Sequence, residues 1–187
     1  MVVTTAMSKS VSVENVVVSA DTGTELDLEA VNSDIQHADF TPDNFPGIIY
    51  RNNEPKFTGL LFRSGKIVCT GTTSVSSAKT AVGIMIDELK DLGVPVSNHT
   101  ASVENIVTTT EFETQFNLSS VAVALGLENI EYEPEIFPGL VYRNIESGVV
   151  ILLFSSGKGV VTGASSIEEA TRGATQIADT LKEFQLL

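Results

Sequence analysis

Apolar and polar residues alternate along several short segments of the chain, and in longer segments apolar residues recur every third or fourth position. The alternation predicts β-strands over residues 11–18, 47–52, 58–63 and 66–71. Residues 26–34 predict a short helix, and residues 75–92 predict a long amphipathic one. Turns predicted at Asn52–Asn53 and Ser64–Gly65 make neighbouring strands antiparallel. The pattern therefore indicates an α+β unit.

The same pattern occurs twice. Residues 13–17 (VENVV) recur at 103–107 (VENIV), an offset of 90. At an offset of 92, residues 45–51 (FPGIIYR) recur at 137–143 (FPGLVYR), and residues 60–71 (LLFRSGKIVCTG) recur at 152–163 (LLFSSGKGVVTG). The second copy thus holds two extra residues, between about 121 and 132. We predict an N-terminal tail over 1–10, a first repeat over 11–96 and a second over 97–187.

Each copy ends in a long helix with one apolar face. In the second copy, Ser166 and Glu169 predict a capping box at the start of this helix. The positions predicted to face the sheet are Ala78, Ala81, Val82, Met85, Leu89 and Leu92 in the first copy and Ile167, Ala170, Ala174, Ile177, Leu181 and Phe184 in the second. One long helix per copy covers one face of a sheet and leaves the other without helices.

The predicted sheet is apolar on both faces, although an antiparallel sheet with one helix layer normally has a polar outer face. Because side chains alternate along a strand, two sets form in each copy. Leu61, Ile67 and Cys69 oppose Leu60, Phe62, Val68 and Thr70, and Leu153 and Val161 oppose Leu152, Phe154, Val160 and Thr162. The second face is either buried within the protein, as in a three-layer fold or a tight dimer, or a binding surface. The helix count favours a binding surface.

Composition complicates the choice of partner. The chain has 187 residues and a formal net charge of −13, which should repel nucleic acid. The charges are unevenly distributed, however. The segment between residues 47 and 70 contains four basic residues, Arg51, Lys56, Arg63 and Lys66, and one acidic residue, Glu54. Most acids fall on the predicted helices and end loops. The lone Cys69 cannot form an internal disulfide, which indicates a reducing, cytoplasmic location, and no segment predicts a membrane span.

The repeated ENVV and ENIV segments, the two FPG-apolar-apolar-YR segments, the two F-x-S-G-K turns and the two TG strand ends resemble the archaeal TATA-binding protein family over residues 11–185. The resemblance implies a saddle, in which two pseudo-symmetric repeats form a curved antiparallel sheet with helices on its convex face. It implies a general transcription initiation factor that binds and bends TATA-box DNA from the minor groove. The acidity predicts a halophilic source, because in molar salt the screening length falls to about 3 Å and the acidic residues of one chain hardly repel one another.

Minor-groove chemistry agrees with this resemblance. A·T pairs present only acceptors there, so an apolar face with a few amide and hydroxyl donors selects them. The family implies phenylalanine wedges, Phe45 with Phe62 and Phe137 with Phe154, and phosphate contacts from basic residues. The predicted DNA-binding set is Asn15, Val17, Phe45, Arg51, Leu60, Phe62, Lys66, Val68, Thr70, Asn105, Val107, Phe137, Arg143, Leu152, Phe154, Lys158, Val160 and Thr162. The role of Arg63, where the family usually has Ser, stays open.

The resemblance also implies protein partners. The loop 131–136 corresponds to the segment that meets transcription factor B, with Glu133, Glu135 and Ile136 as contact residues. Read without the family, the same loop is an exposed acidic turn. RNA polymerase would be recruited indirectly, the free protein could form a homodimer, and the protein would be associated with the nucleoid in the cytoplasm. The resemblance implies no cofactor and no metal.

Two other function classes compete with this interpretation. An enzyme is disfavoured, because His37 and His99 lie outside the repeated motifs and Cys69 has no nearby His. No phosphate loop or zinc-ligand spacing occurs. The alternative is a binding module that uses the apolar sheet to hold a protein or a lipid.

Overall fold

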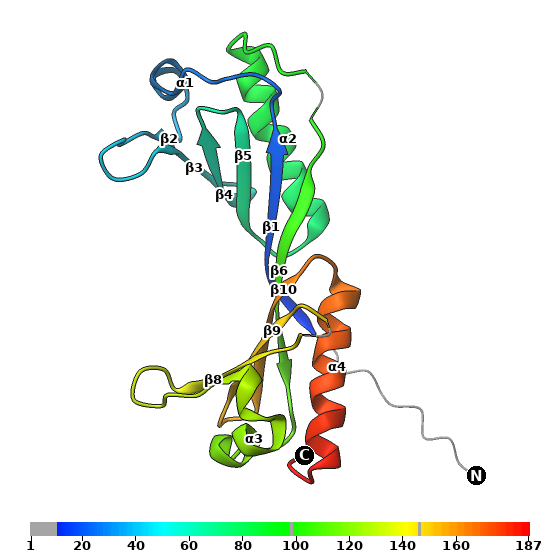
Figure 1. Ribbon diagram of the computed structural model, residues 1–187. Helices are drawn as coiled ribbons and strands as arrows, with labels where there is room; N and C mark the ends of the chain where they lie inside the picture. Colours follow the sequence, from blue (N-terminus) through cyan, green and yellow to red (C-terminus); the bar gives the residue numbers. More distant parts are fainter. Residues whose placement is uncertain (1–10, 98, 146) are drawn as a thin grey trace, which may run out of the picture. The chain divides into compact units, whose positions relative to one another are not determined.

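The computed structural model describes residues 11–97, 99–145 and 147–187, which form two compact units. One unit comprises residues 15–104, and the other comprises residues 105–187 together with 11–14. Each unit consists of an antiparallel sheet, one long helix and one short α-helix (Figure 1). The predicted tail over residues 1–10 lies outside the described residues. No helix in the described ranges is long and apolar enough to cross a membrane.

The first unit follows the predicted order of elements. These are β1 (Ser12–Asp21, whose first three residues belong to the other unit), α1 (Leu28–Asp34), β2 (Ala38–Asp39), β3 (Gly47–Asn53), β4 (Lys56–Phe62), β5 (Lys66–Thr72) and α2 (Val75–Asp91). The strand order is β2-β3-β4-β5-β1, with antiparallel pairing throughout. The turn predicted at Asn52–Asn53 is wrong. Both residues pair within the β3-β4 ladder, and the chain reverses at Glu54 and Pro55, where proline cannot continue the ladder.

The second unit repeats this arrangement. Its elements are β6 (Ser102–Glu111, whose first three residues belong to the first unit), α3 (Leu118–Leu125), the 3₁₀ helix η1 (Leu127–Asn129), β7 (Ile130–Glu131), β8 (Gly139–Arg143), β9 (Val150–Phe154), β10 (Lys158–Ala164) and α4 (Ile167–Glu183). The strand order is β6-β10-β9-β8-β7, again antiparallel. The stretch 121–132, where the repeats differ in length, holds the end of α3 and η1. The first unit has no 3₁₀ helix among its described residues.

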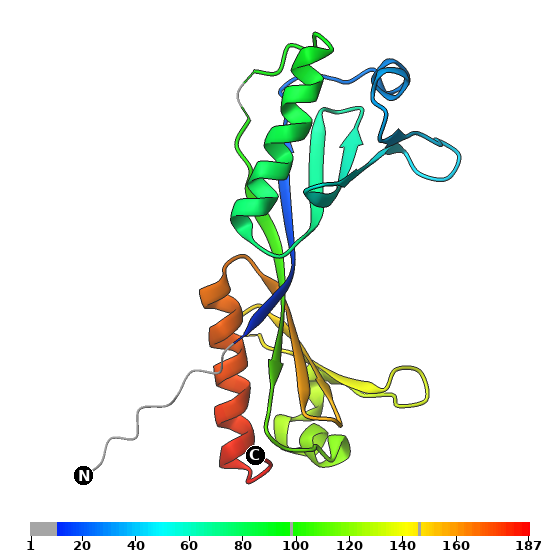
Figure 2. The ribbon, with the colours of Figure 1, turned by 180° about the vertical axis from the view of Figure 1, so that it is seen from behind.

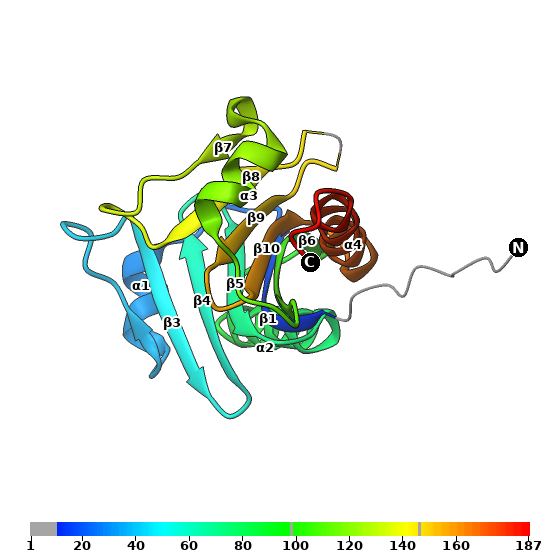
Figure 3. The same cartoon turned by 90° about the horizontal axis from the view of Figure 1, so that it is seen from below.

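One face of each sheet packs against the long helix of the same unit, as Figure 2 shows from the helix side. In the first unit, Leu61, Ile67 and Cys69 are at most 1% exposed, and they meet the buried side of α2. Leu153 and Val161 are equally buried under α4. The predicted assignment of faces is thereby confirmed for the buried set. Figure 3, seen from below, shows α4 along its axis.

Three predicted core positions of the helices are wrong. Leu92, Ile167 and Phe184 are 38%, 42% and 53% exposed. Each lies at a helix end, Leu92 and Phe184 as C-caps and Ile167 as the first residue of α4. A helix end extends beyond the sheet that its central turns cover, so regular spacing continues there without burial.

The helix starts are capped by side chains. Ser166 accepts a hydrogen bond from the Glu169 backbone N–H, as predicted. The return bond differs from the predicted box, because the Glu169 carboxylate accepts from the backbone N–H (2.8 Å) and hydroxyl (2.9 Å) of Ser165, one residue earlier. These bonds stabilise the ionised form and lower the pKa of Glu169.

Two buried titratable groups belong to the core of the first unit. The Tyr50 hydroxyl donates to Glu88 (2.8 Å), which ties β3 to α2, and burial raises the pKa of Tyr50. Cys69 is buried as predicted, and burial raises the pKa of its thiol to about 11. A thiol with this pKa stays protonated at neutral pH and behaves as a small core residue.

The two neighbours Leu60 and Leu61 provide a matched test of the faces. Leu61→Ala should lower the free energy of unfolding by about 2–5 kcal/mol, because it leaves a cavity under α2. Leu60→Ala removes the same atoms from the half-exposed face and should cost less than about 1.5 kcal/mol. Urea unfolding followed by circular dichroism measures both values. Equal losses would mean that both faces are packed inside the protein.

Candidate nucleic-acid interface

The face of each sheet opposite the long helix is partly exposed, and we call it the open face. Along β4 and β5, buried residues alternate with half-exposed ones. The half-exposed predicted residues of the first unit are Val17, Leu60, Phe62, Val68 and Thr70. Those of the second unit are Val107, Leu152, Phe154, Val160 and Thr162. The structure therefore places the predicted apolar binding residues of each unit together on one face.

A hydrogen-bonded cluster lies on the open face of the first unit. Asn15 Nδ2 donates to Thr70 Oγ1 (3.0 Å), and the Thr70 hydroxyl donates to Asn15 Oδ1 (3.2 Å). The backbone N–H of Gly71 also donates to Asn15 Oδ1 (2.9 Å). The sequence predicted Asn15 and Thr70 as separate donors. The structure bonds them directly to each other and adds a third member, the Gly71 N–H, which sequence reasoning missed.

The second unit contains the same cluster. Asn105 Nδ2 donates to Thr162 Oγ1 (3.1 Å), the Thr162 hydroxyl donates back to Oδ1 (3.3 Å), and the Gly163 N–H donates to Oδ1 (2.8 Å). Gly71 and Gly163 have φ values of +87° and +88°, which glycine adopts without strain. The pairing register shifts at both places, as expected for a β-bulge.

Each unit also has a pair of aromatic rings. The ring centroids of Phe45 and Phe62 lie 5.7 Å apart, and those of Phe137 and Phe154 lie 5.9 Å apart, with tilted planes. Phe137 is 36% exposed even though it touches its partner. The predicted pairs therefore form in each unit, with ring surface left accessible.

The glycine of each FPG segment makes room for a ring pair. A Cβ atom at Gly139 would lie 2.7 Å from Phe137 Cε1 and 3.0 Å from Phe154 Cε1. At Gly47, a Cβ would lie 2.8 Å from the Leu61 carbonyl oxygen and within 3.2 Å of both rings. Any larger residue must push the rings aside. This contact explains why glycine follows Phe-Pro in both repeats.

Sequence reasoning left two further apolar residues out of the site. Ile49 pairs with Leu60, and Val141 pairs with Leu152 in the matching ladder. Both are half-exposed, and paired residues project from the same side of a sheet. The available signal was strand alternation, since Ile49 and Val141 lie two residues before Arg51 and Arg143.

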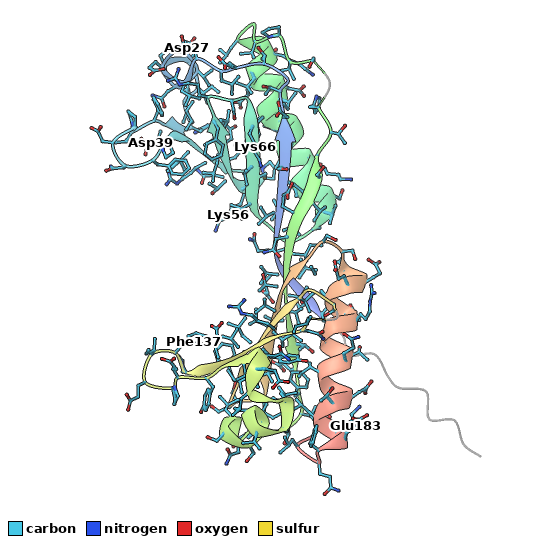
Figure 4. All side chains as sticks on the ribbon, in the orientation of Figure 1. Asp27, Asp39, Lys56, Lys66, Phe137 and Glu183 are labelled. Atoms are coloured by element: carbon cyan, nitrogen blue, oxygen red, sulfur yellow. The ribbon has the colours of Figure 1, made fainter. Side chains whose placement is uncertain are left out.

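Carboxylates lie beside two of the four predicted phosphate-binding residues. Arg143 donates through Nε (3.0 Å) and Nη2 (2.9 Å) to Glu131, and Lys158 lies 3.9 Å from Glu111. Arg51, within β3, and Lys66, the first residue of β5, are both exposed (Lys66 is labelled in Figure 4). The sequence missed the ion pairs, because strand pairing brings the acids next to the bases from other segments.

Arg63, whose role the sequence left open, pairs with Glu29. Its Nη2 lies 3.2 Å from both carboxylate oxygens, and both side chains are more than half exposed. The pair links the turn after β4 to α1 within the first unit. An exposed ion pair of this kind contributes little to stability.

The loop between β7 and β8 protrudes from the second unit (Figure 1). The Ile136 and Phe137 backbone N–H groups both donate to the Glu133 carbonyl (2.9 Å each), which gives the loop a compact turn. Glu133 and Glu135 are exposed, and Ile136 is 80% exposed. An apolar side chain held this openly beside two acids is available to a protein partner.

The described residues contain no cluster of three or more His, Cys, Asp or Glu side chains that could hold a metal ion. His37 and His99 lie in separate segments outside the strands of the open faces. The open faces themselves present apolar side chains, asparagine amide donors and charged residues at their edges.

Comparison with known proteins gives consistent matches. Residues 10–92 and 100–184 match the family of transcription factor TFIID, or TATA-binding protein (TBP). The chain is 48% identical over 179 residues to TATA-box-binding protein 2 of Haloferax volcanii, covering 95% of this chain and 96% of that one. It is 46% identical over 182 residues to TATA-box-binding protein B of Halobacterium salinarum, covering 97% and 98%. The structure of Methanococcus jannaschii TBP aligns with a TM-score of 0.84 at 44% identity, covering 93% and 99%.

These matches confirm the predicted fold class, with two α+β repeats, and agree with the acidity, because the two named sequence relatives come from halophilic archaea. The family is a class of transcription factors and not of enzymes. The chain therefore belongs to the TATA-binding protein family.

Proposed function

We propose that this protein is a general transcription initiation factor that binds TATA-box DNA through the minor groove. The observation that carries the proposal is the matched Asn-Thr cluster, set among apolar residues on the open face of each unit. The relatives are named for binding the same DNA element. Duplication of the cluster suits a short duplex, whose two halves present similar edges to the two repeats.

The chemistry of the open faces matches an A·T-rich groove. Such a groove presents N3 and O2 acceptors, and a G·C pair adds an amino group that protrudes into it. Val17, Val68 and Leu60 give a dry surface that fits a groove floor without that amino group. Asn15 supplies a donor, because its Nδ2 has a second hydrogen besides the one that it donates to Thr70.

In this proposal the two phenylalanine pairs bend the DNA. A ring inserted between base pairs unstacks one step at a cost of a few kcal/mol, which the added contact with bent DNA offsets. Phe137 supports the role, because it leaves part of its ring exposed beside a close-packed glycine. Arg51, Lys66, Arg143 and Lys158 would then meet phosphates beside the groove.

The proposed function is tested by footprinting on an A·T-rich promoter in molar potassium chloride, together with a circular-permutation assay of bending. We expect a short protected site and a bend centred on it. A binding module for a lipid or a protein is the competing function, suggested by the exposed apolar faces. Asn15→Leu separates the two, because it should weaken TATA binding in fluorescence anisotropy and leave lipid or protein binding intact.

We further propose that the β7-β8 loop binds transcription factor B, and through it RNA polymerase. Glu133→Ala combined with Glu135→Ala should leave DNA affinity within about twofold and weaken the ternary complex about tenfold, because exposed charges matter mainly to the partner that faces them. A gel shift with and without transcription factor B measures both effects.

Asp43→Ala is the matched control for this experiment. Asp43 is an exposed acid in the corresponding β2-β3 loop of the first unit. Equal weakening by Asp43→Ala, or no weakening by the double variant, would remove the assignment of the β7-β8 loop.

A further inference from the structure

The Asn-Thr-Gly clusters fix which way each asparagine amide points. Asn15 Oδ1 accepts from the Gly71 N–H at 2.9 Å, and Asn105 Oδ1 accepts from the Gly163 N–H at 2.8 Å. If either amide were turned over, its Nδ2 donor would face the glycine N–H, donor against donor. A backbone N–H cannot change into an acceptor, whereas the threonine hydroxyl can rotate. The glycine N–H is therefore the group that sets the orientation.

We propose that Gly71 and Gly163 are positioning residues that determine the discrimination of A·T from G·C pairs. The inference rests on the proposed function. With Oδ1 held by glycine, one Nδ2 hydrogen is donated to threonine, and the second is left for the DNA. Each asparagine then presents a donor to the groove and never an acceptor.

The direction of the amide decides which base pair is accepted. A donor can bond to adenine N3 or thymine O2, whereas it meets the guanine amino group as donor against donor. An amide free to turn could present Oδ1 to that amino group and accept a G·C pair. Holding the amide therefore adds a penalty against G·C, beyond the steric one from the apolar residues around it.

The positive φ of Gly71 and Gly163 explains why glycine is needed at the position whose N–H holds the asparagine amide. At the bulge, φ values of +87° and +88° turn the N–H toward the asparagine on the neighbouring strand. A Cβ atom at Gly71 would touch nothing closer than 3.7 Å, so space alone does not exclude alanine. The backbone angle excludes it, because side chains other than glycine are strained there.

The test removes only the N–H. An ester oxygen replaces the backbone N–H of Gly71, of Gly163, or of both, by semisynthesis. Affinity is then measured on promoter duplexes in which one central A·T pair is replaced by inosine·cytosine or guanine·cytosine. Inosine lacks the amino group, so the ratio of these two affinities isolates its effect. In the unmodified protein we expect inosine·cytosine to bind about tenfold or more tightly than guanine·cytosine, within the usual cost of one wrong base pair.

The ester proteins should lose most of this ratio, falling to about threefold or less, because the amide can turn. Thr70→Val is the matched variant: it should weaken binding to every duplex and keep the ratio, since the glycine N–H still holds the amide. An ester at Gly83, inside α2, controls for the loss of one backbone hydrogen bond. It should also keep the ratio.

Asn15→Asp provides a second measurement that does not depend on folding of an ester protein. Its carboxylate still accepts from Gly71 and presents an oxygen outward, so the ratio should fall below one. A ratio unchanged in the ester proteins, or still above about tenfold in Asn15→Asp, would overturn the positioning role alone. If the unmodified protein does not distinguish the two duplexes, the proposed function itself fails.

Discussion

Removing one phenylalanine of each pair, by Phe45→Ala with Phe137→Ala, should lower TATA-box affinity by roughly 10²–10⁴-fold and abolish most of the bend. Burial of one Phe side chain is worth about 1.5–3 kcal/mol, so losing two wedges removes about 3–6 kcal/mol of contact. Unstacking becomes unnecessary without the rings, which returns part of that free energy. Fluorescence anisotropy gives the affinity, and energy transfer between dyes at the duplex ends gives the bend.

The Phe45 and Phe137 substitutions should do little harm to the fold. Phe137 is 36% exposed and lies near the end of the β7-β8 loop, so its removal leaves no closed cavity. Phe184→Ala is the control, because Phe184 is more exposed, at 53%, and caps the far end of α4. Retained bending in the double variant, or an equal loss of affinity in Phe184→Ala, would contradict the wedge role.

Much of the fold could be predicted, because the alternation of apolar and polar residues indicates which side of each strand is buried and the repeated segments indicate two similar units. Leu61 and Ile67 had to be buried on the helix side, since strand alternation puts them on one face and each unit has one long helix. The same reasoning failed at Ile167 and Phe184, where helical periodicity runs past the edge of the sheet. It also failed at Asn53, because a turn signal competed with a proline two residues later.

The candidate site was less accessible to sequence reasoning, because its geometry depends on pairing between distant segments. The repeated threonine-glycine segment was visible in the sequence. It did not reveal the β-bulge, because one extra residue leaves the alternation of a short strand almost unchanged. The contact between the bulge and Asn15 arises only when β1 is placed beside β5. The pairing of Arg143 with Glu131 likewise needs β7 and β8 to be neighbours.

We expect the ion pairs beside the open faces to change how TATA-box affinity depends on salt. DNA-binding proteins that neutralise phosphates release counterions, and six to ten such contacts cost about 10³–10⁵-fold in affinity between 50 and 200 mM salt. Here Arg143 and Lys158 already have carboxylate neighbours, Glu131 and Glu111. When a phosphate binds Arg143 or Lys158, the neighbouring carboxylate repels it. A potassium ion taken up from solution relieves this repulsion. Uptake of cations opposes their release, so TATA affinity should hold or rise from low to molar potassium chloride.

Glu131→Gln combined with Glu111→Gln should make TATA affinity fall with rising salt, as it does for most DNA-binding proteins. Without these carboxylates, Arg143 and Lys158 would neutralise phosphates and release counterions, and no potassium ions would be taken up. Two neutralised phosphates correspond to a slope of about −2 in log affinity against log salt, relative to the unmodified protein. Glu183→Gln, at the exposed end of α4 (Figure 4), also removes a negative charge but lies on the helix that covers the opposite face of the sheet. Its slope should match that of the unmodified protein. If the unmodified protein, the double variant and Glu183→Gln all lost TATA binding steeply toward molar salt, Glu131 and Glu111 would have no part in the salt dependence. Net charge alone would then govern it.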